Sequence, residues 1–119
     1  MDKRPKILYV EDDDSVFNAI KRQFDGRVEL LRGATLEEGE KLFWENQMTL
    51  DLVIMDGCIN STAPNTMPLI RKIAKTGFKP IIACSSHPCY NRFLIDAGCT
   101  DEIEKSEIVD YTLNLFNIK

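Results

Sequence analysis

The sequence has no long hydrophobic run. None of its apolar stretches approaches the roughly 18 consecutive residues of a membrane-spanning helix, so we expect no contact with the membrane. The N-terminal residues MDKRPKILYV run directly into the acidic Glu11, without the apolar core and small-residue cleavage site of a secretory signal peptide. These absences predict a cytoplasmic protein.

Basic residues are also in short supply. The 119 residues include 15 lysines and arginines against 19 aspartates and glutamates, which gives a formal net charge of −4 at pH 7. Binding to nucleic acid regardless of sequence relies on Lys and Arg at the phosphates, so this balance argues against a direct nucleic-acid partner. It does not exclude an acidic pocket that holds a metal ion.

The four cysteines include no C-x-x-C pair. Without a secretory signal, free thiols in a reducing compartment are the expected state. Cys84, His87 and Cys89 lie close together in the sequence and are candidates for a metal site with Cys58 or Cys99. Because their spacing matches no structural zinc motif, we interpret the cysteines as ordinary thiols.

Short apolar runs alternate with amphipathic segments along the chain. Residues 7–10, 52–55 and 81–84 show no alternation with polar residues, which is typical of strands buried on both faces of a parallel sheet. Residues 28–32 and 100–104 are predicted to be weaker edge strands. The pattern predicts one α/β domain over residues 1–119, a flavodoxin-like five-stranded parallel sheet of order 2-1-3-4-5 with helices on both faces.

The amphipathic segments between these runs carry helix start signals. Thr35 followed by Glu38 is typical of a capping box. Asp13 and Asp14 are interpreted as acids at the N-terminus of the first helix, where the helix dipole favours them. The other predicted starts are Asn65 or Thr66, Pro88 and Ser106, and the residues expected to face inward are Val16, Phe17, Ile20 and Phe24, then Leu36, Leu42 and Phe43, then Leu69, Ile70 and Ile73, then Phe93, Leu94 and Ala97, and finally Ile108, Val109, Leu113 and Phe116.

Polar residues follow four of the predicted strands. Glu11 and Asp12 follow the first strand, Asp56 the third, Ser85 the fourth and Lys105 the fifth. Because open α/β sheets bind ligands at the carboxyl ends of the strands, beside the switch in strand order, we expect these side chains to converge. Clustered carboxylates repel one another unless a cation neutralises them, and Mg²⁺ prefers oxygen ligands. The sequence therefore predicts a Mg²⁺ site at this edge of the sheet.

Four segments, in order and each at a strand end, resemble a known family. They are residues 7–13 (ILYVEDD), 51–56 (DLVIMD), 80–86 (PIIACSS) and 97–101 (AGCTD), the last leading to Lys105. Together they resemble the receiver domain of two-component response regulators over essentially the whole chain. The resemblance implies a phosphoacceptor that takes a phosphoryl group from a histidine kinase or phosphotransfer protein and signals to a downstream protein by contact, without turning over as an enzyme.

The resemblance also implies a role for each acidic residue of the predicted site. Asp56 resembles the phosphoacceptor, a carboxylate nucleophile that forms an aspartyl phosphate. Glu11 and Asp12 resemble the acidic pair that holds Mg²⁺, with Glu11 acting directly or through a water. Asp56 itself and the main-chain carbonyl of Cys58 resemble the remaining protein ligands of the metal.

Two further residues resemble the groups that bind the phosphoryl oxygens. Ser85 resembles a hydroxyl that moves toward the modified Asp56, and Lys105 resembles the family's basic partner. The implied mechanism is a population shift, in which phosphorylation changes the face made by the fourth helix, the last strand and the last helix.

Three residues depart from the family pattern. Asn60 stands where receivers usually carry a proline, in a loop over residues 57–65 that is about two residues longer than usual. Ser106 replaces the usual proline after Lys105, so the bond between them is expected to be trans. Glu102 replaces an aromatic residue that rotates inward in the family, so we expect the switch to be read through other residues.

Two other classes of function are compatible with the fold. The first is a pseudo-receiver, an interaction module that keeps the fold without phosphorylation-driven switching; Asn60, Glu102 and Ser106 favour it, and the intact acids oppose it. The second is a Mg²⁺-dependent phosphohydrolase with an aspartyl nucleophile. That family requires a second aspartate two residues after the nucleophile, and Cys58 occupies this position.

Overall fold

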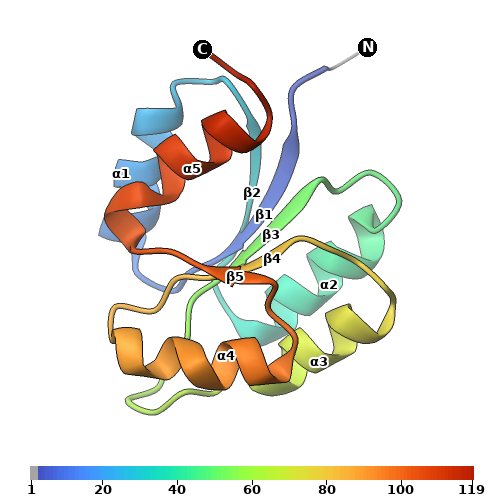
Figure 1. Cartoon of the computed structure of the whole chain (residues 1–119), viewed down its shortest axis with the longest axis vertical. Helices are drawn as coiled ribbons and strands as arrows, with labels where there is room; N and C mark the ends of the chain where they lie inside the picture. The colour runs from blue at the N-terminus through green and yellow to red at the C-terminus, as the bar shows by residue number, and fades with distance from the viewer. Residues whose placement is uncertain (1–2) are drawn as a thin grey trace.

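Five parallel strands form one sheet in the computed structural model of the chain, which describes residues 3–119 (Figure 1). The order β2-β1-β3-β4-β5 confirms the predicted flavodoxin-like topology. The weak C-terminal strand is shorter than predicted and covers two exposed residues. The strands are β1 (Lys6–Val10), β2 (Glu29–Gly33), β3 (Leu52–Met55), β4 (Ile81–Ala83) and β5 (Asp101–Glu102).

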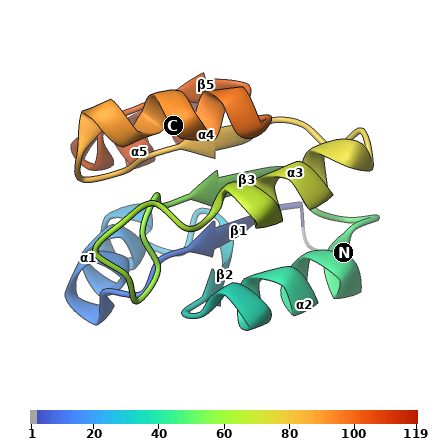
Figure 2. The ribbon, with the colours of Figure 1, turned by 90° about the horizontal axis from the view of Figure 1, so that it is seen from below.

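The helices cover both faces of the sheet. Helices α1 and α5 pack on one face, and α2, α3 and α4 pack on the other, as Figures 1 and 2 show from two directions. Their bounds are α1 (Asp14–Phe24), α2 (Leu36–Asn46), α3 (Met67–Lys75), α4 (Asn91–Ala97) and α5 (Ile108–Leu115).

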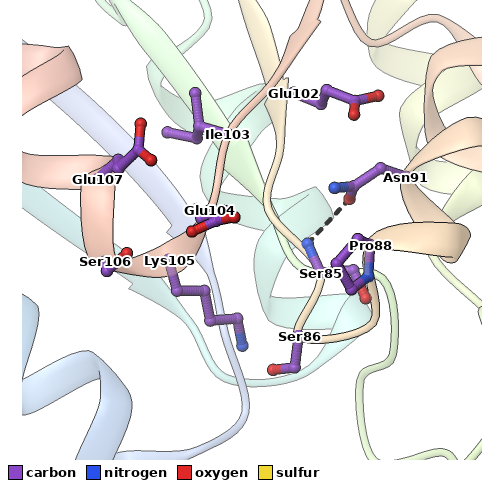
Figure 3. A pocket seen from close by; sticks show the side chains of 10 residues that line it. All are labelled: Ser85, Ser86, Pro88, Asn91, Glu102, Ile103, Glu104, Lys105, Ser106 and Glu107. Atoms are coloured by element: carbon purple, nitrogen blue, oxygen red, sulfur yellow. Dashed lines mark hydrogen bonds between the residues drawn. The ribbon is translucent and has the colours of Figure 1, made fainter.

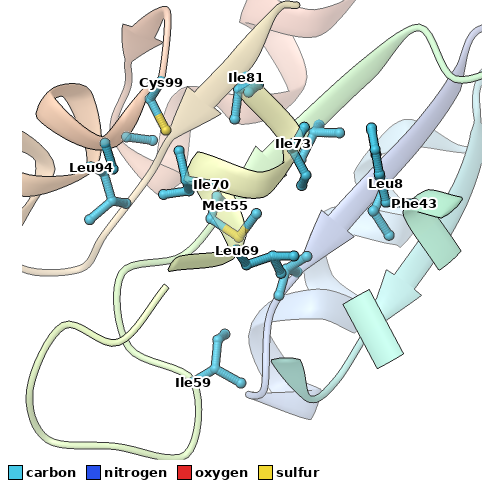
Figure 4. Packing of buried hydrophobic residues seen from close by; sticks show 14 of the residues in the cluster. Leu8, Phe43, Met55, Ile59, Leu69, Ile70, Ile73, Ile81, Leu94 and Cys99 are labelled. Carbon is cyan, nitrogen blue, oxygen red and sulfur yellow. The ribbon is translucent and has the colours of Figure 1, made fainter. Parts of the chain in front are cut away.

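The sheet divides the hydrophobic core into two layers, and strand β1 contributes to both because its side chains alternate between the faces. Leu8 and Val10 belong to the layer under α2, α3 and α4, which Figure 4 shows around Met55 and Ile70. Ile7 and Tyr9 belong to the layer under α1 and α5. All four residues of the β1 run are fully buried, as expected for a central strand of a doubly covered sheet (Ile7, Leu8, Tyr9 and Val10).

The first two helices begin as predicted. A side-chain oxygen of Asp13 accepts a hydrogen bond from the Val16 amide at 3.1 Å. Thr35 Oγ1 accepts one from the Glu38 amide at 3.1 Å, which confirms Thr35 as the N-cap of α2. The predicted stripe of α1 is buried at Phe17, Ile20 and Phe24.

The prediction for the fourth helix was partly wrong. Pro88 opens a short 3₁₀ turn over Pro88–Tyr90, and α4 begins only at Asn91. Phe93, predicted to face inward, is 52% exposed. The reason is that Asn91 is buried and accepts a hydrogen bond from the Ser85 amide, and a residue two positions later lies roughly 200° around the helix.

Ser106 does not cap the last helix, so that prediction was wrong. It lies in a 3₁₀ turn over Lys105–Glu107, and α5 begins at Ile108 without a side-chain cap. The turn is closed by a hydrogen bond from the Glu107 amide to the Glu104 carbonyl at 2.9 Å. The bond between Lys105 and Ser106 is trans, as expected.

Length and polarity rule out a membrane-spanning role for every helix within residues 3–119.

Candidate functional site

Polar residues from four strand ends line a pocket of about 360 Å³ at the carboxyl edge of the sheet. One carboxylate oxygen from each of Glu11, Asp12 and Asp56 lies within 4.8 Å of the others. The structure therefore brings together side chains that are up to 94 residues apart in the sequence. The lining includes every residue that the sequence analysis assigned to the site, namely Glu11, Asp12, Asp56, Cys58, Ser85 and Lys105.

The alternative cysteine–histidine metal site is not formed. All four cysteines are free. Within residues 3–119 the acidic triplet is the one group of three metal-ligating side chains that lie close enough to share an ion.

Glu11 is fully buried, and protein donors occupy both of its carboxylate oxygens. Oε1 accepts hydrogen bonds from the Tyr9 hydroxyl at 2.8 Å and from Lys105 Nζ at 2.7 Å. Oε2 accepts one from the Asp13 amide at 3.2 Å. Because a buried carboxylate is costly without partners, these donors both permit the charge and fix the orientation of the side chain.

Lys105 connects two of the three acids. Its Nζ lies 2.7 Å from Oε1 of Glu11 and 3.3 Å from Oδ2 of Asp56. Burial lowers the pKa of Lys105, but the hydrogen bond to Glu11 and the charges of Asp56 and Glu11 more than offset burial, so its pKa is raised. The ammonium therefore stays protonated and supplies the positive charge between the two carboxylates.

Asp56 is almost fully buried and electrostatically unsatisfied. Burial, followed by the charge of Glu11, raises the pKa of Asp56 to about 6, although Lys105 opposes the rise. The amide of Gly57 donates to Oδ1 at 2.7 Å. One ammonium is thus too little positive charge for this cluster, and a divalent cation with oxygen ligands fits the deficit.

Asp12 is held by the loop that follows β3. The Asn60 amide donates to Oδ2 of Asp12 at 2.7 Å. Asn60 has a φ of 53°, a left-handed conformation that a proline ring cannot adopt, so this loop conformation is incompatible with a proline at position 60. Asn65 fixes the loop by bonding both the amide and the carbonyl of Ile59 at 2.8 Å.

Cys58 lines the same pocket and is partly buried. Burial, followed by the charges of Asp56 and Asp12, raises the pKa of the Cys58 thiol above its usual value. The thiol is therefore protonated near neutral pH and adds no charge to the acidic cluster. The predicted role of its main-chain carbonyl as a metal ligand stays a prediction.

Ser85 faces the segment that follows Asp56. A Cβ on Gly57 would lie 2.9 Å from Ser85 Oγ, so a larger residue at this position would require the Ser85 side chain to move. Ser85 Oγ accepts a hydrogen bond from the His87 amide at 3.2 Å. His87 itself is exposed, and its ring contacts Tyr90.

A second pocket of about 510 Å³ opens beside Ser85, between the β4–α4 loop and the segment that enters α5. Figure 3 shows it with Asn91 bonded to Ser85 and with Lys105 at its edge. Glu102 lies in its lining, is exposed, and stands where the family has its rotating aromatic residue.

Sequence analysis missed two residues that support the site. Tyr9, treated as one member of an apolar strand, donates from its hydroxyl to Glu11. Arg32, treated as a charge on an edge strand, donates to the main-chain carbonyls of Glu11 and Asp12. The sequence offered one signal for Tyr9, a hydroxyl inside an otherwise aliphatic run, and none for Arg32, whose alignment with Tyr9 depends on the register of β1 and β2.

No protein-family model and no curated protein matches the sequence. Solved structures match over nearly the whole chain. A response regulator receiver domain protein from Clostridium thermocellum has a TM-score of 0.74 and 24% identity, with 95% of this chain and 94% of that chain covered. A response regulator receiver protein from Pseudoalteromonas atlantica has a TM-score of 0.74 and 20% identity, with 95% and 98% covered.

A third similar structure is the N-terminal domain of an uncharacterized protein from Wolinella succinogenes. It has a TM-score of 0.72 and 27% identity, with 96% of this chain and 94% of that chain covered. Together with the strand order, these likenesses show that the chain has the fold of response regulator receiver domains, as the motifs predicted.

Proposed function

We propose that the protein is a phosphoacceptor receiver of a two-component pathway, in which Asp56 accepts a phosphoryl group from a histidine kinase or phosphotransfer protein. The observation that carries this proposal is the contact of one ammonium, on Lys105, with both Glu11 and Asp56 in a solvent-accessible acidic pocket. A site that holds excess negative charge around one lysine suits a metal ion and an anionic phosphoryl group bound together.

Asp12, Asp56 and the Cys58 carbonyl would hold Mg²⁺ in this pocket, with Glu11 as a further ligand, directly or through a water. When bound, Mg²⁺ supplies positive charge that offsets the charge of the transferring phosphoryl group. The Asn60 amide bonds only Oδ2 of Asp12, so this contact does not involve Oδ1.

Asp56 acts as the nucleophile in this proposal. A pKa of about 6 leaves its carboxylate ionised near neutral pH. A bond forms between a carboxylate oxygen of Asp56 and phosphorus while the P–N bond of the phosphohistidine donor breaks, and the bonding electron pair returns to the imidazole nitrogen. Lys105 and Ser85 then bind oxygens of the new phosphoryl group, which draws their loops toward Asp56.

The partners in this proposal are proteins at both steps. A histidine kinase or phosphotransfer protein donates the phosphoryl group, and a downstream protein reads the changed surface by contact. The net charge of −4 supports the absence of a direct nucleic-acid partner, and the four free thiols suit a reducing cytoplasm. In this proposal the receiver domain acts as a stoichiometric acceptor and not as an enzyme that turns over.

A second candidate function is a pseudo-receiver. The exposed Glu102, in a two-residue edge strand, favours it because a charged side chain does not rotate into the apolar interior to report the state of the site. In that case the fold would bind its partner without being switched by phosphate.

Acetyl phosphate with Mg²⁺ separates these functions. We expect intact-mass spectrometry to show the addition of one phosphoryl group to the wild-type protein and none to the Asp56→Ala variant. No adduct on the folded wild type would favour the pseudo-receiver. Continuous release of phosphate without a stable adduct would point to a phosphohydrolase.

A further inference from the structure

Arg32, near the end of edge strand β2, contacts the main chain of Glu11 and Asp12, the first two of the four acidic residues that follow β1. Its Nε donates to the carbonyl oxygen of Glu11 at 3.1 Å, and its Nη2 donates to the carbonyl oxygen of Asp12 at 3.2 Å. Nη2 also lies 2.7 Å from Oδ1 of Asp14. One guanidinium thus spans the whole segment that leads from β1 into α1.

The sheet and α1 fix the position of this guanidinium. Arg32 is the register partner of Tyr9 in the parallel pair of β1 and β2, so the two side chains leave the sheet on the same face. The Phe17 ring of α1 lies 5.1 Å from Arg32 Cζ. The Arg32 side chain is 23% exposed, so packing holds its guanidinium, a planar fork of N–H donors, in place.

We propose that Arg32 is a positioning residue of the Mg²⁺ site, an inference that rests on the proposed function. By holding two consecutive carbonyls, it fixes the peptide planes from which the side chains of Glu11 and Asp12 enter the pocket. Asn60 then holds Asp12 from the opposite side through its amide. Arg32 contacts Glu11 and Asp12 through their main-chain carbonyls, so it acts on the acidic pair through the main chain.

The sign of the effect distinguishes positioning from charge. A cation beside a cation site disfavours metal binding, so removal of the Arg32 charge alone would tighten the binding of a divalent ion. Loss of the fork would instead let the acidic loop relax and weaken binding. Partners of metal-ligating groups typically contribute 10–100-fold to metal affinity.

The test is a titration with Mn²⁺, followed through the electron paramagnetic resonance signal of the free ion, on variants that circular dichroism shows to be folded. We expect Arg32→Gln to raise the Kd for Mn²⁺ by about 10-fold. Arg32→Lys keeps the charge but cannot reproduce the fork, so it is also expected to bind more weakly than the wild type. If Arg32→Gln does not fold, Arg32→Lys carries the same comparison.

Arg27 provides the matched control. It is also partly buried and also holds two carbonyls, donating from Nε to Phe24 at 2.9 Å and from Nη2 to Gln23 at 2.8 Å, but at the other end of α1. Arg27→Gln removes the same charge and the same kind of contact and is expected to leave the Kd for Mn²⁺ unchanged. Asp14→Asn breaks the ion pair with Arg32 while keeping its carbonyl contacts, and we expect a much smaller change than for Arg32→Gln.

Three results would overturn the inference: tighter or unchanged Mn²⁺ binding by Arg32→Gln, wild-type affinity in Arg32→Lys, or an equal loss in Arg27→Gln. The wild-type titration tests the proposed function separately. If the wild type binds no Mn²⁺, the metal-dependent function and the inference built on it both fail. If the wild type binds and the Arg32 variants bind equally well, the inference alone fails.

Discussion

Nζ of Lys105 lies 2.7 Å from Oε1 of Glu11, a residue 94 positions earlier in the chain. This contact joins the segment after β5 to the end of β1, and the same ammonium reaches Asp56 after β3. Three separate loops therefore share one ion-paired network. Its balance of charge controls both the stability of the unliganded protein and the chemistry that the site can perform.

Replacement of Lys105 by methionine is expected to destabilise the protein by about 2–4 kcal/mol at pH 7 without metal, because two largely buried carboxylates lose their shared cation. Urea unfolding in the presence of EDTA measures this loss. At pH 5 the loss should be smaller, because Asp56, with a pKa of about 6, is then mostly protonated. An equal loss at both pH values would show that the charge of Asp56 does not contribute to the effect of Lys105.

Replacement of Asp56 by asparagine is expected to stabilise the metal-free protein near neutral pH. The pKa of Asp56 rises from 3.8 to about 6 on folding. The stability that the wild type gains from a protonated Asp56 is therefore fully present below pH 3.8 and is lost as the pH rises through about 6. A shift of roughly two units corresponds to about 3 kcal/mol, which is the upper limit for the gain in Asp56→Asn at pH 7.

Urea unfolding of the wild type and Asp56→Asn across pH 4–8, in EDTA, tests this expectation. The two curves should meet near pH 4 and separate toward pH 7. Added Mg²⁺ should reduce the difference, because the ion stabilises the ionised wild type by mass action. A variant less stable than the wild type at pH 7 would show that Asp56 is not electrostatically strained in the folded protein.

The strands were predictable from sequence because the apolar runs of a doubly covered sheet are short and uninterrupted, as at β1 and β3. The acidic site followed from the topology, since Glu11 and Asp56 come directly after two adjacent parallel strands. The N-cap of a helix was predictable where a side chain accepts a hydrogen bond from an amide in the first turn of the same helix, as Thr35 does from Glu38.

The errors arose where a distant contact overrides a local pattern. The buried bond between Asn91 and Ser85 rotates α4 and leaves Phe93 exposed. The contributions of Tyr9 and Arg32 depend on a register between β1 and β2 that a single sequence does not specify. Hydrogen-bond partners of this kind follow from the packing of elements and not from the spacing of residues along the chain.

Replacement of Tyr9 by phenylalanine is expected to cost about 2 kcal/mol of stability. The buried Glu11 loses a hydroxyl donor while the packing of the ring is kept. Burial, followed by nearby acidic groups, raises the pKa of Tyr9, so the hydroxyl is protonated throughout the physiological range.

Tyr111→Phe is the control, because the partly exposed Tyr111 contacts Asp101 through its hydroxyl at 3.5 Å. Loss of this hydroxyl should change stability by less than about 0.5 kcal/mol. Equal effects of the two substitutions in urea unfolding would mean that the bond to Glu11 contributes nothing.

Introduction of the family's proline at Asn60 is expected to destabilise the protein, although it makes the sequence more like a receiver. Asn60 has a φ of 53° and donates its amide to Asp12, whereas proline requires a φ near −65° and has no amide hydrogen. We expect Asn60→Gly to match the wild type, Asn60→Ala to lose about 1 kcal/mol from the left-handed backbone, and Asn60→Pro to lose at least about 2 kcal/mol. Urea midpoints of the three variants give the order directly. A proline variant as stable as the glycine variant would show that the loop adopts another conformation and that Asp12 does not depend on the Asn60 amide.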